Sequence, residues 1–180
     1  MMRAVFLDRD GVINAPVVRD GKPYPPATSD EFKILDGVAE ACAMLKQAGF
    51  LLVVATNQPD VGRGTQAKET VEAMHAKMRG LLPIDRIEVC YEPGQGAKSL
   101  FRKPAPGMLL AAARELDIDL PQSYMVGDRW RDIDAGIAAG CKTIFIDHGY
   151  DEVLREQPHW RAANLLEAAG IIVGAKEVKI

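Results

Sequence analysis

The sequence has few cysteines, and their arrangement excludes one class of protein. Cys42, Cys90 and Cys141 are odd in number and far apart in the chain. A disulfide-rich secreted domain usually carries an even number of cysteines at short, regular spacings. The cysteine content therefore argues against a disulfide framework and favours a reducing compartment. We expect a cytoplasmic protein.

Long hydrophobic runs are also missing. The longest uninterrupted apolar stretch, Phe50–Ala55, is far shorter than the roughly 20 residues that cross a bilayer. Near the N-terminus, Asp8 follows four apolar residues, and neither a long apolar segment nor a small-residue cleavage site is present. We expect no membrane span and no secretion signal.

Charge of one sign is not concentrated anywhere. The 180 residues carry 22 basic and 25 acidic side chains, a net charge of −3, without a run of five or more like charges. Such a chain has nothing that would neutralise a row of phosphates or coat an anionic membrane, so we expect no nucleic-acid or membrane partner. Its length predicts a single domain over residues 1–180, with about 70% of the unfolded surface buried.

Short apolar runs alternate with helical patterns along the chain. The predicted strands are Val5–Leu7, Phe50–Ala55, Ile87–Cys90, Tyr124–Val126 and Thr143–Ile146. The predicted helices are Gly37–Ala48, Ala67–Leu81, Pro106–Leu116 and Ile133–Ala139. This alternation is typical of βαβ units, so we predict an α/β, doubly wound (Rossmann-like) fold: a parallel sheet of about five strands flanked by helices.

Three segments are less regular. Ala15–Asp30 is rich in proline and is predicted to be an ordered loop without helix or strand. Glu92–Arg102 is a second loop, and loops of this length in a compact domain are commonly functional. After Trp160 we expect a closing helix, with a short strand as a further option.

Polar residues follow the predicted strands where ligands bind in this architecture, at the carboxyl ends. They are Asp8, Asp10 and Gly11 after the first strand, Thr56, Asn57 and Gln58 after the second, and Asp128, Arg129 and Asp132 after the fourth. Lys103 lies between Arg102 and Pro104, where it could open the following helix. Three strand ends therefore offer carboxylates and a hydroxyl, with a cation nearby.

This combination predicts phosphoryl chemistry with a metal. Mg²⁺ prefers carboxylate oxygens and water, and Asp8 and Asp128 could supply the carboxylates. Alternate residues of an extended strand face the same side, so Asp8 and Asp10 should point together, one to attack phosphorus and the other to move protons. Thr56 and Lys103 would hold the transferring oxygens.

Simpler explanations exist for each residue alone. A single aspartate at a strand end is most often a turn former or helix cap, and Asp132 could cap the helix that follows it. Lys103 alone would be a surface lysine. A non-hydrolytic phosphoacceptor domain uses similar residues, but its phosphoacceptor aspartate follows the third strand, and the third run here ends in Cys90-Tyr91-Glu92.

The segment Phe6–Asn14 resembles motif I of the haloacid dehalogenase (HAD) superfamily, in the form found in histidinol-phosphate and heptose bisphosphate phosphatases. Thr56 resembles motif II, Lys103 motif III, and the segment from Gly127 to Asp132 motif IV, in the expected order. The resemblance covers nearly the whole chain, and it implies a Mg²⁺-dependent phosphatase of a small phosphate ester.

The resemblance also implies a role for each residue. Asp8 would be the nucleophile and Asp10 the general acid and base, with Mg²⁺ held by Asp8, the backbone carbonyl of Asp10, and Asp128. Thr56 and Lys103 would stabilise the phosphoryl group, supported by Gly11 and Asp132. The positions that match substrate contacts in the family are Thr56, Asn57, Gln58, Arg102, Lys103 and Arg129.

Two features set this chain apart within the resemblance. The intervals between the motifs are filled by ordinary elements, which predicts a capless enzyme. The family's zinc-binding loop is reduced to Cys90, and one cysteine cannot replace about four ligands, so we predict no zinc. The expected substrate is a sugar phosphate or bisphosphate, with D-glycero-D-manno-heptose 1,7-bisphosphate as the lead and histidinol phosphate as the alternative. We expect a monomer, with a homodimer as the other option.

Overall fold

Six parallel strands form the central sheet of the computed structural model, which describes residues 1–20, 22–96 and 98–175. The strand order is β5-β4-β1-β6-β7-β8. Their bounds are β1 Arg3–Leu7, β4 Phe50–Asn57, β5 Arg86–Cys90, β6 Tyr124–Gly127, β7 Lys142–Ile146 and β8 Trp160–Ala162. The order reverses between β1 and β6, and ligands bind at such a switch point. The predicted doubly wound fold is confirmed.

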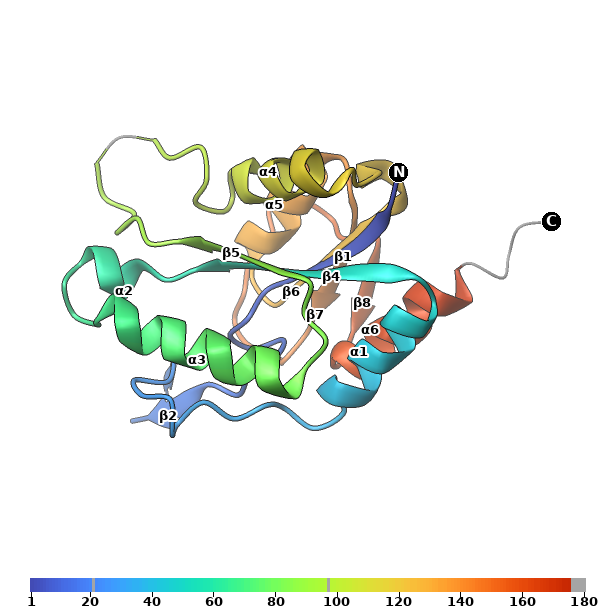
Figure 1. Cartoon of the computed structure of the whole chain (residues 1–180). Coiled ribbons are helices and arrows are strands. Elements are labelled where there is room, and N and C mark those ends of the chain that lie inside the picture. Colours follow the sequence, from blue (N-terminus) through green and yellow to red (C-terminus); the bar gives the residue numbers. More distant parts are fainter. Residues whose placement is uncertain (21, 97, 176–180) are drawn as a thin grey trace.

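Helices cover both faces of this sheet, as Figure 1 shows. On one face lie α1 (Val38–Gln47), α3 (Lys68–Leu81) and α6 (Leu165–Gly174). On the other lie α4 (Gly107–Leu116) and α5 (Trp130–Ala139). Two short elements complete the chain, α2 (Pro59–Gly62) and the 3₁₀ helix η1 (Leu120–Gln122). Both faces are therefore shielded from water, which explains why the strands read as continuous apolar runs rather than as alternating ones.

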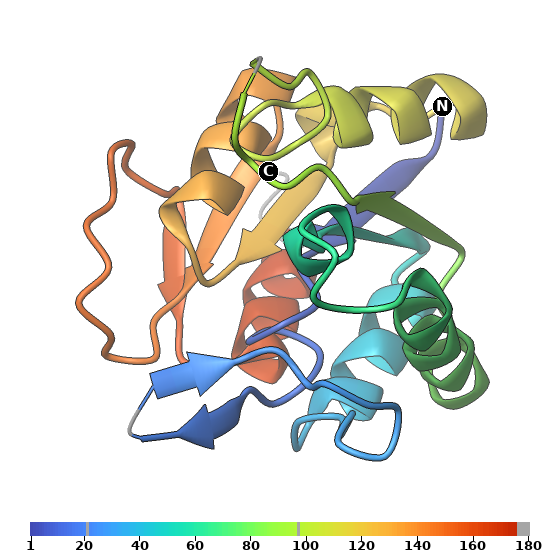
Figure 2. The ribbon, with the colours of Figure 1, turned by 90° about the vertical axis from the view of Figure 1, so that its left-hand side faces the viewer.

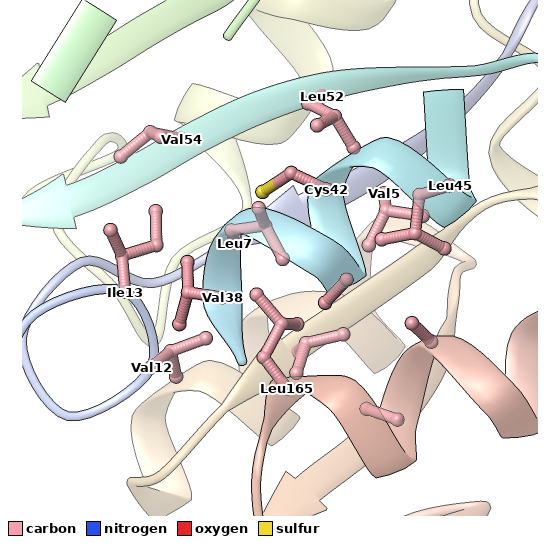
Figure 3. Close-up of a cluster of buried hydrophobic side chains, with 14 of the residues drawn as sticks. Val5, Leu7, Val12, Ile13, Val38, Cys42, Leu45, Leu52, Val54 and Leu165 are labelled. Atoms are coloured by element: carbon pink, nitrogen blue, oxygen red, sulfur yellow. The ribbon is translucent and has the colours of Figure 1, made fainter. Parts of the chain in front are cut away.

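The alternation of β1 divides the core into two clusters. Val5 and Leu7 face α1 and α6, where Figure 3 shows them beside Cys42 and Leu45 of α1. Ala4 and Phe6 face the opposite side and belong to the cluster beneath α4. Burial of each large apolar side chain stabilises the fold by about 1.5–3 kcal/mol, so the sheet that carries the strand ends is rigidly held.

Two expectations about regular structure need correction. Ala15–Asp30 is not free of strands, because β2 (Val17–Arg19) and β3 (Lys22–Tyr24) form an antiparallel hairpin. Pro23 pairs with Val18 in this two-stranded ribbon, where a missing N–H is tolerated as it would not be in a central strand. The sheet has six strands rather than about five, because Trp160–Ala162 pairs with β7 although it is too short to form an apolar run.

Several element boundaries also differ in detail from the expectation: α5 begins at Trp130 rather than Ile133, and β4 continues to Asn57, so Thr56 and Asn57 lie within this strand. The helix after Lys103 begins at Gly107, so the lysine precedes it in a loop and does not open it. The expected closing helix is α6, and it includes Ile171–Val173. The short strand comes before this helix, as β8.

Three segments surround the carboxyl ends of the strands in Figure 2: the β2–β3 hairpin, the loop between β5 and α4, and the loop after β7. Within the described part of the chain, the interval between β1 and β4 holds the hairpin and α1, and no separate cap domain stands there. None of the described helices is long and apolar enough to cross a bilayer.

The contact between α5 and the sheet gives a stability prediction. A methyl group at Gly136 would lie 2.6 Å from Thr143 Cγ2 and 2.7 Å from Met125 Cβ, so Gly136→Ala should lower the free energy of unfolding by about 1–3 kcal/mol. Gly170 in α6 has open space around it, and Gly170→Ala should raise stability by about 0.5–1 kcal/mol. Urea unfolding of both variants checks this, and equal stabilities would contradict the packing.

Candidate active site

A cavity of about 460 Å³ opens at the switch point of the sheet. It brings together ten of the residues predicted from the sequence: Asp8, Asp10, Gly11, Asn57, Gln58, Arg102, Lys103, Asp128, Arg129 and Asp132. Thr56 is buried and does not line the cavity. Parallel strands present their carboxyl ends at one edge, which is why residues from β1, β4 and β6 meet here.

Lys103 is the central cation of this cavity and is almost fully buried. Its Nζ lies 2.8 Å from Asp8 Oδ1 and 2.6 Å from Asp132 Oδ1, and it donates to the Ala55 carbonyl at 2.7 Å. Burial acts to lower the pKa of this ammonium, but the two carboxylates outweigh burial and raise its pKa above the usual value. Lys103 is therefore a fixed positive charge and not a surface lysine.

Asn57 fixes the backbone that carries this lysine. Its Oδ1 accepts from Lys103 N and its Nδ2 donates to Lys103 O, both at 3.1 Å. The side chain therefore closes a two-bond ring with the chain between β5 and α4. Asn57 reaches the cavity wall, and in this structure its amide serves to place Lys103.

Asp8 follows the last residue of β1 and faces Lys103. Burial and the nearby charge of Asp132 raise the pKa of Asp8 to about 6, against the opposing effect of Lys103. The group is thus mainly ionised at neutral pH but poorly solvated. A desolvated carboxylate held by one hydrogen-bonded oxygen is suited to attack an electrophile with the other.

Asp128 carries the strongest sign that this cavity suits a cation. Its Oδ1 is buried, with no hydrogen-bond partner among the described residues. Burial, followed by the charges of Asp8 and Asp132, raises the pKa of Asp128 to about 9. One oxygen from each of these three carboxylates lies within 4.8 Å of the others. Three carboxylates face one ammonium, so the residues fit a hard divalent cation such as Mg²⁺.

Two glycines make this crowding possible. A methyl group at Gly11, whose φ is +86°, would overlap the Asp128 carboxylate. A methyl group at Gly127 would likewise overlap Asp132. The close approach of the carboxylates to the backbone thus depends on the absence of side chains at both positions.

Asp132 does two things at once. Its Oδ2 accepts from Arg129 N at 3.0 Å, so Asp132 does cap α5, but from the first turn of a helix that begins at Trp130 and not from a position before the helix. Its Oδ1 is paired with Lys103. The side chain therefore fixes the position of Lys103 relative to α5.

Asp10 lines the same cavity as Asp8 but has different partners. Its carboxylate accepts from Arg9 Nη2 at 3.0 and 3.2 Å, and from Asn14 Nδ2 and Gln58 Nε2 at 2.9 Å each. Burial acts to raise the pKa of Asp10, but the Arg9 charge and the two amides hold it below the usual value. Both aspartates lie beyond the end of β1 at Leu7, and both line the cavity.

Gln58 connects Thr56 with Asp10. Gln58 Nε2 donates to both Asp10 and the Thr56 hydroxyl, at 2.9 Å each. Because Thr56 accepts this hydrogen bond, its own proton is left for donation. Gln58 therefore joins the acid/base candidate to the motif II residue.

Four arginines surround the cavity mouth, and the sequence analysis identified two of them, Arg102 and Arg129. The other two lining residues are Arg63 and Arg131. Burial and the neighbouring charges of Arg131 and Arg63 lower the pKa of Arg102. Arg63 pairs with Asp60 at 3.3 Å and Arg129 with Glu152 at 3.5 Å.

Within the described residues, Arg102 and Arg131 have no carboxylate in ion-pair contact. The mouth therefore keeps positive charge that is not neutralised by the protein. Arg131 lies within the motif IV segment, in the first turn of α5, but was not among the predicted site residues, and Arg63 lies outside the motifs, at the end of α2.

The loop between β5 and α4 is closed by protein contacts. Arg102 Nη1 donates to the Glu92 carbonyl at 3.1 Å, and Ser99 Oγ accepts from the backbone of Phe101 and Arg102. A methyl group at Gly94 would lie 2.8 Å from the Arg102 guanidinium carbon, so the two are packed together. Cys90 is buried at the end of β5, as expected. The absence of zinc stays a prediction.

Two residues outside the predicted set also touch this site. His148, from the loop after β7, donates from Nε2 to the Gly11 carbonyl at 2.6 Å. His75, from α3, contacts Arg9. No sequence motif includes either histidine, and only the tertiary fold brings them beside motif I.

Comparison with known proteins gives a consistent result. The HAD-hydrolase-like family matches residues 100–168. A heptose-1,7-bisphosphate 7-phosphatase of Burkholderia mallei, described for the α anomer of D-glycero-D-manno-heptose, is 40% identical over 80% of this chain and 79% of its own. One of Yersinia pestis, described for the β anomer, is 40% identical over 78% of this chain and 77% of its own.

Solved structures agree with these relatives. A D,D-heptose 1,7-bisphosphate phosphatase from B. bronchiseptica, crystallised with magnesium and phosphate, has a TM-score of 0.83 and 33% identity, covering 97% of this chain and 99% of its own. A putative HAD-like phosphatase from Mesorhizobium loti has a TM-score of 0.75 and 30% identity, covering 97% and 87%.

Proposed function

Because this chain belongs to the HAD superfamily, in the branch that contains the heptose bisphosphate phosphatases, and is therefore a phosphoric monoester hydrolase, we propose that it hydrolyses a sugar bisphosphate through an aspartyl-phosphate on Asp8. The observation that carries the proposal is the pairing of a poorly solvated Asp8 with buried Lys103, beneath a mouth that keeps unneutralised arginines.

In the first step the Asp8 oxygen not held by Lys103 attacks phosphorus, and the bond from phosphorus to the sugar oxygen breaks. The leaving oxygen takes a proton from Asp10, which lines the same cavity and enters this step protonated, although its contacts favour the charged form in the free protein. Lys103 and the Thr56 hydroxyl stabilise the negative oxygens of the transferring group. Mg²⁺, held by Asp8, Asp128 and the Asp10 carbonyl, would neutralise charge on the phosphoryl group when bound.

In the second step water attacks the phosphorus of the aspartyl-phosphate. Asp10 accepts the proton of this water, inorganic phosphate leaves, and the Asp8 carboxylate is regenerated. Ionised Asp10 suits this role, since Arg9, Asn14 and Gln58 favour its charged form. Each cycle leaves Asp10 in the proton state in which it began.

The charge of the mouth favours a bisphosphate over the alternative substrate. A second phosphate on the sugar would meet Arg102 and Arg131, which lack a carboxylate partner in the described structure. Histidinol phosphate carries a cationic amine and no second phosphate, so it would gain no attraction from these arginines. We therefore keep D-glycero-D-manno-heptose 1,7-bisphosphate as the lead and treat histidinol phosphate as the weaker candidate.

Phosphate release with Mg²⁺ tests this proposal. The panel contains heptose 1,7-bisphosphate in both anomers, other hexose and heptose phosphates, histidinol phosphate and nucleotides. We expect kcat/KM for one sugar bisphosphate to exceed that for histidinol phosphate at least about tenfold, or 1.4 kcal/mol. A preference for histidinol phosphate would overturn the substrate assignment. No release from any substrate, with Asp8 stably phosphorylated by acetyl phosphate, would instead support the phosphoacceptor alternative.

The arginine argument gives a separate prediction. Arg131→Gln should raise KM for the preferred bisphosphate by about 10- to 100-fold, because a charge-assisted contact is lost, and should leave KM for the matching monophosphate within about twofold. Arg155→Gln is the control, since Arg155 stacks on Trp130 and does not line the catalytic cavity. An equal rise in KM for both substrates would show that Arg131 does not bind the second phosphate.

The remaining parts of the proposal concern context. We infer one functional domain over residues 1–180, a capless site, no zinc and no nucleic-acid partner. A cytoplasmic location is consistent with the three cysteines, which are free and buried. We infer a monomer, with a homodimer as the alternative. Light scattering checks the oligomeric state.

A further inference from the structure

Arg9 is a fully buried arginine that the proposed reaction does not use. It is 0% exposed, and its guanidinium carbon lies 5.6 Å from the centre of the Phe32 ring. A buried guanidinium is costly unless its donors are satisfied. One of its two terminal nitrogens, Nη2, donates to both oxygens of Asp10. The other one points to a different element.

That second nitrogen contacts His75 of α3. Arg9 Nη1 and His75 Nε2 are 3.1 Å apart. A guanidinium can only donate, so Nε2 must be the acceptor, which requires a neutral imidazole with Nε2 unprotonated. Burial and then the charge of Arg9 lower the pKa of His75 to about 4, which agrees with a neutral ring. The histidine therefore serves as a buried acceptor for the arginine.

We propose that His75 and Arg9 are positioning residues, which hold the Asp10 carboxylate in the direction that its proton transfers require. This inference rests on the proposed function. The guanidinium is a rigid planar fork, anchored at one end on α3 and at the other on Asp10. Asn14 and Gln58 fix the remaining positions around the carboxylate. Without the His75 acceptor, Nη1 would lose its partner and the fork could turn away from Asp10.

A purely structural role for Arg9 is the competing explanation. The Arg9 carbonyl accepts from the backbone of Val12, Ile13 and Asn14, so this residue also holds the turn after β1. That contact belongs to the backbone and does not need the guanidinium. The test therefore changes His75, which leaves the turn intact and removes only the acceptor at the far end of the fork.

The first experiment compares His75→Leu with His75→Gln. Leucine keeps the bulk and removes the acceptor, whereas glutamine returns an acceptor oxygen close to the place of Nε2. We expect His75→Leu to lower kcat for the preferred sugar phosphate by about 10- to 100-fold, with KM within about twofold, and His75→Gln to recover most of it. His159→Leu is the control, because His159 contacts Thr143 and not the cavity. Wild-type kcat in His75→Leu would overturn the inference.

The second experiment separates positioning from general damage. In an Asp10→Asn background the proton-transfer group is already lost, so adding His75→Leu should lower kcat by less than about twofold further. Full multiplication of the two losses would show a merely structural role and overturn the inference. If the wild-type protein releases no phosphate, or if Asp10→Asn matches wild type, it is the proposed function that fails. If both behave as proposed and only His75→Leu is without effect, the inference alone fails.

Discussion

Asp8→Asn is expected to lower kcat for phosphate release by a factor on the order of 10⁴ to 10⁶, because the amide cannot form the aspartyl-phosphate. The loss should be in kcat, since the cavity mouth that binds substrate is unchanged. Asparagine has nearly the same shape and keeps an oxygen that can accept from Lys103 Nζ. Steady-state phosphate release with Mg²⁺ measures the effect.

The fold of this variant serves as the control for the loss. Asp8 carries a pKa raised to about 6 by burial and Asp132, so its ionised form is unfavourable in the folded state. Removing that charge should leave the protein at least as stable as wild type in thermal unfolding without metal. Asp151→Asn, at an exposed carboxylate outside the catalytic cavity, should keep full activity. Activity of Asp8→Asn within about 100-fold of wild type would rule out the proposed nucleophile.

Asp128 should make the metal-free protein less stable as pH rises. The pKa of Asp128 is about 9 in the folded protein and 3.8 for an ordinary aspartate, the value taken for the unfolded state. Between these two pH values the native state therefore holds a proton that the unfolded state has lost. Stability therefore falls with increasing pH, by about 1.4 kcal/mol per unit. Between pH 7 and 8.5 we expect a loss of about 2 kcal/mol. His75, with a pKa of about 4, and Asp8, with a pKa of about 6, contribute little to the change in stability between pH 7 and 8.5.

Asp128→Asn should remove this slope, which urea unfolding at several pH values measures. The same variant should lose the rise in Tm that Mg²⁺ gives the wild-type protein, because Asp128 is a proposed ligand and its Oδ1 has no hydrogen-bond partner among the described residues. Asp151→Asn should keep both the slope and the Mg²⁺ effect. A stability that is flat with pH in the wild type would contradict the account of Asp128.

The candidate site was largely predictable because its aspartates come after strands. Asp8 and Asp128 come directly after β1 and β6, and parallel pairing of these strands brings their ends to one edge of the sheet. The end of each apolar run predicts where a strand ends. The first polar residue after the run is then the candidate site residue. Asp132 could be read either as a cap or as a partner of Lys103, and the structure shows both contacts.

Other contacts depended on tertiary packing that no local pattern reveals. His75 and Arg9 are far apart in the chain and meet only because α3 turns the His75 side toward motif I. The β2–β3 hairpin was not predicted because proline is usually excluded from central strands. In a two-stranded ribbon Pro23 is tolerated, since both strands are edge strands. Arg63 reaches the cavity from the C-terminal end of α2 and Arg131 from the first turn of α5, and neither placement follows from a simple sequence period.

The most direct test of the account is to find the phosphoryl group on the protein. Wild-type protein is quenched in acid during turnover of heptose 1,7-bisphosphate with Mg²⁺, and its peptides are mapped by mass spectrometry. We predict a phosphoryl group on Asp8, and none in Asp8→Asn treated in the same way. Phosphate release without any phosphorylated peptide, or with the group on another residue, would contradict Asp8 as the nucleophile.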